Sequence, residues 1–172
     1  DLAKRITCAF YAPSKTFNLA GLVGSYHIIY RDDLREKVLK TESLSHYNSH
    51  NIMSTYALIG GYEGGAEWVD ELCAYICGNM QYCEDYCKKH FHGVKFTVNE
   101  GAYVALMDCT EWLDATGKTM DDMLDDMAWC GILVRDGCSF HADHHVRINF
   151  ACPRLTVEQM MERLDKYVFN KK

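Results

Sequence analysis

Apolar residues recur with a helical period over three stretches in the second part of the chain. The longest runs from Ala66 to about His90, and Gly78-Asn79 marks a point where this helix is expected to bend. Its expected buried face consists of Trp68, Leu72, Tyr75, Ile76 and Met80. A second helix is expected behind Thr119 as N-cap, with apolar positions Met120, Met123, Leu124 and Met127. The last is expected behind a capping box of Thr156 and Gln159, with the buried face Val157, Met160, Met161, Leu164 and Val168.

Four stretches between these helices have the composition of β-strands. They are residues 94–98, 102–110, 131–137 and 145–152, and a hairpin turn at Asn99-Glu100-Gly101 joins the first two. In the last stretch, Val146, Ile148 and Phe150 are expected on one face of the strand and Arg147, Asn149 and Ala151 on the other. The order of elements predicts an α+β sandwich, with helices on one side of a mostly antiparallel sheet.

The first sixty or so residues do not predict a closed unit. Residues 5–12 are expected to form a mostly buried strand and residues 26–30 a second strand, whereas residues 32–43 and 47–63 are expected to be helical. Two strands and a few helical pieces are too little for a sheet covered on both faces. This part of the chain is therefore expected to belong to a larger domain.

Charge and composition exclude several kinds of partner. The chain has 172 residues, a formal net charge of −6, and 18 Lys and Arg that are scattered rather than clustered. This distribution argues against nucleic acid or an anionic membrane surface as a partner. The longest apolar runs, such as residues 102–107, are too short to span a bilayer. We expect a cytoplasmic protein, and the nine cysteines are then expected to be reduced thiols.

Two clusters of potential metal ligands have a simpler interpretation. Cys73, Cys77, Cys83 and Cys87 lie inside a helical pattern, so packing on an apolar face explains them better than a zinc site does. The His-rich segment at 141–145 offers few convergent ligands, and the acids at 121–126 fit the solvated face of a helix. We expect no metal.

Lys15 stands in a loop directly after the first predicted strand. Burial among Ala12, Pro13, Phe17 and Leu19 would disfavour its charged form, and neutral lysines of this kind form Schiff bases with carbonyl compounds. Ser14 and Thr16 could hydrogen-bond a phosphate, and Gly21 and Gly24 would allow a ligand to approach the backbone. A solvated loop lysine is the alternative interpretation.

Arg147 lies in the middle of a strand that is expected to be half-buried. A guanidinium there needs an anionic partner, because a lone buried charge costs several kcal/mol. A carboxylate of the protein would serve, and so would the carboxylate of a substrate, which arginine can bind through two parallel hydrogen bonds.

Taken together, these motifs resemble the class I/II aminotransferase superfamily of fold type I, which uses pyridoxal phosphate. The segment "APSKTFNLAGL" resembles its cofactor lysine motif. The segments "YEGGAEWVDELCAYICGN", "AYVALMDCTEW" and "GILVRDGCSFHADHHVRINFACPR" are similar to its interdomain helix and two strands of its small domain. The resemblance extends over essentially the whole chain and is greatest to the branch of cystathionine β-lyase-type C–S lyases.

The resemblance implies a role for three residues. Lys15 would form the internal aldimine with pyridoxal 5'-phosphate and shuttle the proton of the substrate, Ser14 would contact the cofactor, and Arg147 would hold the substrate α-carboxylate. The implied reaction on an amino acid is C–S β-elimination, and transamination on the same scaffold stays open. A homodimer is implied for the full-length enzyme.

The resemblance also implies an incomplete domain. Many class I aminotransferases have phosphate-binding residues at the positions that Ala12 and Val23 occupy here, and other cofactor contacts of the family lie upstream of the lysine. Residues 1–62 are thus expected to be the C-terminal part of the large domain with the interdomain helix, and residues 63–172 the complete small α+β domain. The 172-residue chain alone is expected to hold the cofactor poorly. Two alternatives from other classes are a non-catalytic α+β binding or assembly domain and a thiol-rich metal module.

Overall fold

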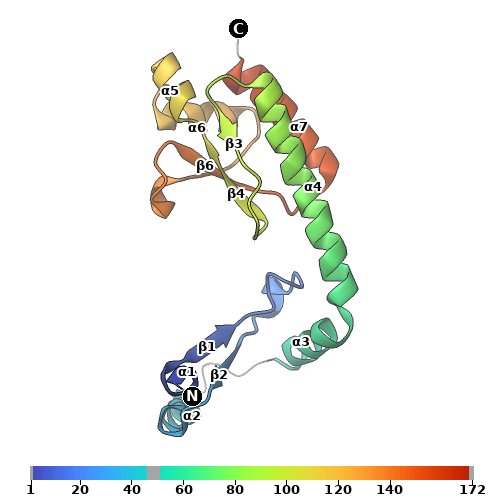
Figure 1. Cartoon of the computed structure of the whole chain (residues 1–172), viewed down its shortest axis with the longest axis vertical. Helices are drawn as coiled ribbons and strands as arrows, with labels where there is room; N and C mark the ends of the chain where they lie inside the picture. The colour runs from blue at the N-terminus through green and yellow to red at the C-terminus, as the bar shows by residue number, and fades with distance from the viewer. Residues whose placement is uncertain (1, 46–50, 171–172) are drawn as a thin grey trace. The chain divides into compact units, whose positions relative to one another are not determined.

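The computed structural model of the protein describes residues 2–45 and 51–170 (Figure 1). The chain forms two compact units, Asp1–Glu71 and Leu72–Lys172. Helices and antiparallel strands occur in both, so the fold belongs to the mixed α/β class that the pattern predicts. Within the described ranges, no helix combines the length and the apolarity that a bilayer crossing requires.

The first unit contains a two-stranded antiparallel ribbon and several helices. Its elements are α1 (Leu2–Ile6), β1 (Cys8–Tyr11), the short 3₁₀ helix η1 (Ala20–Leu22), β2 (Tyr26–Ile29), α2 (Asp32–Ser45), α3 (Ile52–Gly64) and the first turns of α4 (Ala66–His90). Strands β1 and β2 pair from Cys8 opposite Ile29 to Tyr11 opposite Tyr26. The predicted strand at 5–12 is shorter than expected because residues 2–6 form α1.

Few side chains of this first unit are buried. Among its described residues, burial is nearly complete only at Pro13, Ile29 and Ser54. The prediction that the first strand is mostly buried is wrong, since Phe10 is 75% exposed and Tyr11 is also exposed. A two-stranded ribbon has two faces, and the helices of this unit are too few to cover both.

The helices of the first unit agree with the pattern. The helix predicted at 32–43 is α2, and the helix predicted at 47–63 is α3, although residues 47–50 lie outside the described part. Asn51 caps α3, because its side chain accepts a hydrogen bond of 2.8 Å from the backbone N–H of Ser54.

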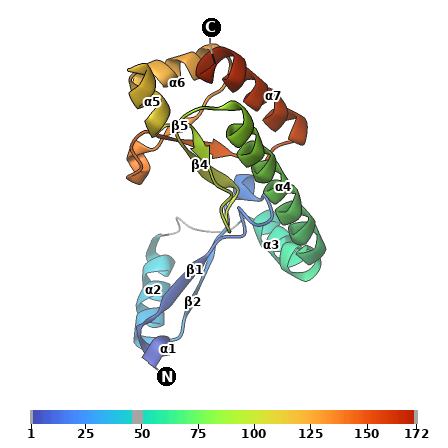
Figure 2. The same ribbon diagram turned by 45° about the horizontal axis from the view of Figure 1, so that its top comes forward.

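The second unit packs helices on one face of a four-stranded sheet (Figure 2). The strands are β3 (Lys95–Phe96), β4 (Val104–Asp108), β5 (Arg135–Asp136) and β6 (His145–Asn149), in the order β3-β4-β6-β5, and all neighbours are antiparallel. The helical elements are the rest of α4, α5 (Thr110–Thr116), α6 (Met120–Trp129), the 3₁₀ turn η2 (Cys138–Phe140), α7 (Arg154–Leu164) and the π-helical turn η3 (Asp165–Phe169). The predicted antiparallel sheet is confirmed.

The core of this unit lies between the sheet and the helices. The alternation predicted for β6 is confirmed, because Val146, Ile148 and Phe150 are buried while Arg147 is half-buried and Asn149 is exposed. Cys83 and Cys87 of α4, Met123 and Met127 of α6, and Met161 and Leu164 of α7 complete the same cluster. Burial of this kind of apolar surface contributes about 25 cal/mol per Å².

The bounds predicted for α4 are confirmed, but its buried face is displaced from the predicted one. Trp68 and Tyr75 are exposed, whereas Met80, Cys83 and Cys87 are buried, because the sheet covers only the C-terminal half of the helix. The helix continues through Gly78 and Asn79 without interruption. Asn79 is buried and donates hydrogen bonds to the carbonyls of Phe150 (3.1 Å) and Cys152 (3.0 Å), so it fixes the chain that leaves β6.

Helix α7 lies beside α4 (Figure 1), and Arg154 at the start of α7 forms a hydrogen bond with α4. The Arg154 guanidinium donates to the carbonyl of Gly78 (2.7 Å) and lies 4.2 Å from the centre of the Tyr82 ring. The predicted capping box of Thr156 and Gln159 is wrong. Pro153 is the N-cap, its φ of −56° suits the start of a helix, and α7 begins at Arg154.

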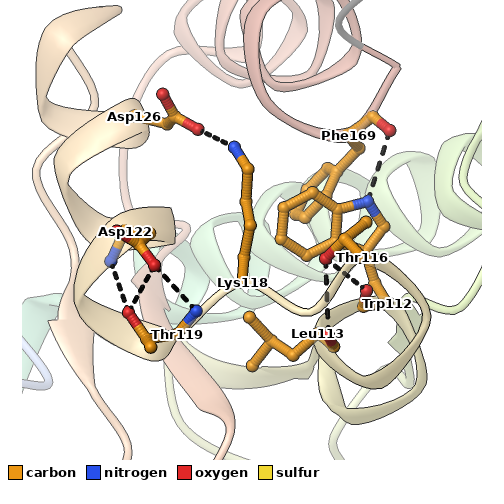
Figure 3. A network of polar contacts seen from close by, with 8 residues as sticks. All are labelled: Trp112, Leu113, Thr116, Lys118, Thr119, Asp122, Asp126 and Phe169. Atoms are coloured by element: carbon orange, nitrogen blue, oxygen red, sulfur yellow. Dashed lines mark hydrogen bonds and ion pairs between the residues drawn. The ribbon is translucent and has the colours of Figure 1, made fainter.

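Helices α5 and α6 meet in a polar network around Lys118 (Figure 3). Thr119 caps α6 as predicted, and it forms a capping box with Asp122, which donates its backbone N–H to Thr119 Oγ1 at 3.2 Å. Lys118 forms an ion pair with Asp126 and lies over the Trp112 ring, and Trp112 donates its indole N–H to the carbonyl of Phe169. The acidic residues of α6 thus cap the helix, form an ion pair or face the solvent.

Two segments differ from the predicted strands. Only Arg135 and Asp136 of residues 131–137 pair as a strand, because Gly131 and Ile132 still bond the last turn of α6. Helix α5 was not predicted, since seven residues with adjacent Trp112 and Leu113 show no clear period. Its start is held by Asp108, whose side chain accepts from the Thr110 backbone N–H (2.9 Å).

The cysteines divide into packing and surface residues. The packing interpretation is confirmed for Cys83 and Cys87, which are buried, and is wrong for Cys73 and Cys77, which are exposed; Cys109 is also buried and Cys138 is exposed. Burial raises the pKa of the Cys109 thiol to about 12, and a hydrogen bond with Cys87 together with burial raises the pKa of Cys83. Both thiols therefore stay protonated at neutral pH. Over residues 2–45 and 51–170, no three His, Cys, Asp or Glu side chains are grouped as metal ligands.

Candidate active site

Lys15 lies at the tip of a tightly wound turn between β1 and η1. The backbone N–H of Phe17 donates to the carbonyl of Pro13 (2.9 Å), and that of Leu19 donates to the carbonyl of Ser14 (3.0 Å). Asn18 has a φ of 54°, in the left-handed region that asparagine tolerates better than most residues. Two crossing backbone bonds of this kind leave the turn little freedom, so the base of the Lys15 side chain has a defined position.

Helix α3 holds this turn through Phe17. A Cβ atom on Gly61 would lie 2.9 Å from Cδ2 of the Phe17 ring, and one on Gly65 would lie 2.8 Å from Cε1. The ring therefore packs directly on the backbone at Gly61, in the last turn of α3, and at Gly65, the C-cap of α3. Tyr62 adds an edge-to-face contact with Phe17 at 5.4 Å between ring centres. This contact explains why small residues occur at these positions of α3.

A second anchor joins the end of the turn to the start of α3. The carbonyl of Leu22 accepts hydrogen bonds from the side-chain amide of Asn51 (3.0 Å) and from the hydroxyl of the buried Ser54. The segment that carries Lys15 is thus fixed to one helix at both ends. Such double attachment is what a reactive side chain needs in order to stay within a fraction of an ångström of its target.

Tyrosines extend this packing to the ribbon. Tyr62 of α3 and Tyr26 of β2 share a hydrogen bond of 2.9 Å between their hydroxyls, and Tyr26 stacks on Tyr11 of β1 at 5.2 Å. The hydrogen bond with Tyr62 raises the pKa of the Tyr26 hydroxyl. The ribbon, the Lys15 turn and α3 are therefore one packed assembly within the first unit.

The expectation that neighbours in the sequence bury Lys15 is wrong for this chain. Pro13 is buried, but the Lys15 side chain is exposed and Ser14 is half-buried. The physical reason is that Phe17 points to the glycines of α3 instead of covering the lysine. The amine of Lys15 is therefore accessible to solvent.

Arg147 lies on the face of the sheet opposite to the core. It pairs with Leu106 of β4 on one side and with Arg135 of β5 on the other. Its guanidinium stacks on the ring of Phe140, 4.9 Å from the ring centre. Among the described residues, no carboxylate forms an ion pair with Arg147 and no hydrogen bond of its guanidinium is found. The sequence left two possible anionic partners for Arg147, a carboxylate of the protein and the carboxylate of a substrate. In the described part of the chain, no protein carboxylate takes this role.

A pocket of about 400 Å³ adjoins Arg147. Its lining consists of Thr97, Asn99, Val104, Ala105, Leu106, Phe140 and Arg147. Asn99 closes the loop between β3 and β4 by donating to the carbonyls of Gly101 and Val104 (3.3 Å for the second bond). In the described part of the chain, Asn99 Oδ1 is the one buried side-chain N or O atom that lacks a hydrogen-bond partner. The pocket thus combines the unpaired guanidinium of Arg147 with apolar walls, as small-molecule sites do.

Lys15 and Ser14 share a turn of the first unit, and Arg147 belongs to the second unit. Sequence reasoning missed Phe140, which stacks on Arg147, and the contact of Phe17 with Gly61 and Gly65. Gly61 and Gly65 could have indicated this contact from the sequence, because small residues one helical turn apart allow another group to approach the backbone closely.

Substitution of Gly61 by Ala is expected to loosen the Lys15 turn. The new Cβ would lie 2.9 Å from the Phe17 ring, so the ring must move away from α3. Overpacking of this kind costs about 1–3 kcal/mol, and urea unfolding followed by tyrosine fluorescence measures it. Gly60→Ala is the matched control, since nothing lies within 4 Å of its Cβ and alanine raises helix propensity there. Equal stability of the two variants would contradict the proposed contact.

The family model for aminotransferases of class I and II matches residues 1–164. The chain belongs to this family. Among curated relatives of this aminotransferase-family chain, Protein MalY of Escherichia coli strain K12 is 27% identical over 152 residues, which cover 85% of the chain and 37% of MalY. Cystathionine beta-lyase PatB of Bacillus subtilis strain 168 is 27% identical over 161 residues, which cover 92% of the chain and 40% of PatB.

Solved structures share the fold of this aminotransferase-family chain. Cystalysin from Treponema denticola, whose crystal structure contains a pyridoxal 5'-phosphate cofactor, matches with a TM-score of 0.86 at 27% identity and covers 96% of the chain. The pyridoxal-phosphate-bound C-S lyase from Staphylococcus hominis matches with a TM-score of 0.81 at 26% identity and covers 95%. The chain spans 42% of the length of each of these two proteins. The predicted family and fold class are confirmed.

Proposed function

We propose that the chain is the C-terminal part of a pyridoxal-phosphate enzyme that cleaves a C–S bond of an amino acid by β-elimination. The main support is the similarity over nearly the whole chain to proteins named C-S lyase and cystathionine beta-lyase. Residues 1–62 are the end of the large domain in this proposal, and residues 63–172 are the small domain. The exposed apolar side chains of the ribbon, Phe10 among them, agree with a surface that more of the large domain covers.

The residues of the first unit fit the attachment of the cofactor. Lys15 presents an exposed primary amine on a turn that is fixed at both ends, and Ser14 places a hydroxyl beside it. Lys15 would bind the cofactor aldehyde covalently, and Ser14 would donate a hydrogen bond to it. Ala12 and Val23 offer no polar side chain for the phosphate, which other parts of the full-length enzyme would bind.

When bound, the pyridinium ring of the cofactor withdraws electrons from the substrate Cα and so acidifies its proton. Lys15 Nζ would take this proton from Cα and return it. Arg147 would bind the α-carboxylate through two parallel N–H···O bonds and so hold the substrate in one orientation on the sheet. Phe140 keeps the guanidinium in place by stacking on it. A thiolate then leaves from the substrate Cβ.

The roles proposed for Lys15 and for Arg147 are the same in elimination and in transamination, so the products decide between the two reactions. The full-length enzyme is expected to release pyruvate, ammonia and a thiol from cystathionine when no keto acid is added. Coupling pyruvate to lactate dehydrogenase and following NADH absorbance measures the reaction. If pyruvate forms only after a keto-acid acceptor is supplied, the enzyme is an aminotransferase and the lyase proposal fails.

We also propose that the full-length enzyme is a cytoplasmic homodimer that acts on a small amino acid. Membership of a family of amino-acid enzymes supports the small-molecule substrate. The same membership argues against the two alternatives, a non-catalytic binding domain and a thiol-rich metal module. The second alternative also lacks support from the described residues, which contain no cluster of metal ligands.

A further inference from the structure

The four cysteines of helix α4 divide into two pairs with the same spacing. Cys83 and Cys87 are buried in the core of the second unit, whereas Cys73 and Cys77, nearer the start of the helix, are exposed. Free cysteines are among the most buried residue types, and packing accounts for the buried pair. Packing does not account for the exposed pair, and the proposed reaction uses neither of its thiols.

The helix brings the two exposed thiols to the same face. Residues four apart in an α-helix are neighbours on its surface, with Cβ atoms about 5–6 Å apart. Cys73 and Cys77 have this separation, and α4 continues through both positions without interruption. The buried pair shows what this spacing allows, because the thiols of Cys83 and Cys87 are hydrogen-bonded to each other. The sulfur atoms of the exposed pair are therefore within reach of one shared ligand.

The spacing excludes two common uses of a cysteine pair. A disulfide needs Cβ atoms about 3.5–4.5 Å apart, which is closer than the helix places these two residues. A structural zinc site takes four ligands, whereas residues 2–45 and 51–170 contain no group of three or more His, Cys, Asp or Glu side chains that could hold a metal ion. A ligand of this pair must therefore be satisfied by two sulfur atoms.

We propose that Cys73 and Cys77 form a surface site for Cu(I), held between two thiolates. Soft thiolate ligands favour Cu(I), zinc and iron–sulfur clusters, and of these only Cu(I) is satisfied by two sulfur ligands in a nearly linear arrangement. Two metal–sulfur bonds of about 2.3 Å place the sulfur atoms about 4.6 Å apart, which suits Cβ atoms about 5–6 Å apart. This is a two-ligand site on the helix surface and not the zinc module that all four cysteines together would form.

Binding at this site is an exchange of protons for a metal ion. Each thiol loses its proton to the solvent, and the two thiolates then bind the cation. Copper stays Cu(I) and the sulfur atoms are not oxidised, so the step needs no oxidant or reductant.

Competition with bathocuproine disulfonate, a chromophoric Cu(I) chelator, tests the site in the full-length enzyme, without oxygen and with ascorbate present. The absorbance of the chelator complex measures the Cu(I) that the protein does not bind. We expect the wild type to withhold one more Cu(I) per chain than the variants Cys73→Ser and Cys77→Ser. Cys138→Ser is the matched control, because Cys138 is an exposed thiol outside α4, and it is expected to bind as the wild type does.

The inference fails if either α4 variant withholds as much Cu(I) as the wild type. It also fails if Cys138→Ser loses as much, since binding would then be adventitious at any surface thiol. A copper-dependent rise in size on gel filtration would show bridging between copies and overturn a site within one helix. Both positions are exposed, so serine is not expected to disturb folding, and circular dichroism checks this.

Zinc provides a second arm of the test. Titration of the same enzymes against a chromophoric zinc chelator is expected to give equal results for the wild type and Cys73→Ser, because two thiolates leave zinc short of ligands. A loss of zinc binding in Cys73→Ser would overturn the assignment of Cu(I) to this pair.

Discussion

Replacing Lys15 by Ala in the full-length enzyme is expected to abolish turnover. Removal of the group that moves the Cα proton costs about 10²–10⁴-fold in rate, and the same variant loses the covalent attachment of the cofactor. The fold is expected to be unaffected, because Lys15 is exposed and the turn is held by Phe17 and by the carbonyl of Leu22. Pyruvate release measures the first effect and the visible absorbance of the cofactor measures the second.

The control for this variant is Lys40→Ala. Lys40 is an exposed lysine of α2 in the same unit, so its replacement changes the net charge equally. It is expected to keep the rate and the absorbance band of the wild type. A Lys15→Ala enzyme with wild-type turnover would leave the solvated-loop interpretation as the correct one.

Replacing Arg147 by Lys is expected to raise KM for the amino acid and to lower kcat much less. The ammonium keeps the charge but cannot form two parallel hydrogen bonds with a carboxylate. Hydrogen bonds to charged groups contribute about 1.5–3 kcal/mol, which corresponds to roughly 10- to 100-fold in KM. Stacking on Phe140 is weakened as well. Steady-state kinetics of the full-length enzyme separate the two constants.

Arg154→Lys provides the contrast for this prediction. Arg154 bonds the carbonyl of Gly78 and the carboxylate of Glu158, so its loss is expected to lower the melting temperature without raising KM. If Arg147→Lys instead lowers the melting temperature and leaves KM unchanged, Arg147 is a structural residue and does not bind substrate.

Elements with several turns or a strict alternation could be predicted from the sequence. The bounds of α4 and the buried alternation of β6 are examples, because both patterns repeat often enough to exclude other structures. The missed features depend on tertiary contacts. Pro153 caps α7 three residues before the predicted cap Thr156, and the exposed Trp68 lies on a part of α4 that the sheet does not reach.

The candidate site divides in the same way. The residue types and positions of Lys15 and Arg147 could be identified from their motifs, since an amine and a guanidinium have few substitutes in this chemistry. Their surroundings could not, because the Phe17 contact with Gly61 and the Arg135 pairing join residues far apart in sequence. Strand register in particular is set by the whole sheet and not by a local pattern.

Borohydride reduction of the full-length enzyme with pyridoxal 5'-phosphate tests the central claim most directly. Reduction fixes the cofactor to the nitrogen that holds it, and peptide mapping by mass spectrometry then locates the label. The account predicts that the label lies on the peptide with Lys15, within the segment "APSKTFNLAGL", and that Lys15→Ala removes it. A label on another lysine, with the Lys15 peptide unmodified, would contradict the account.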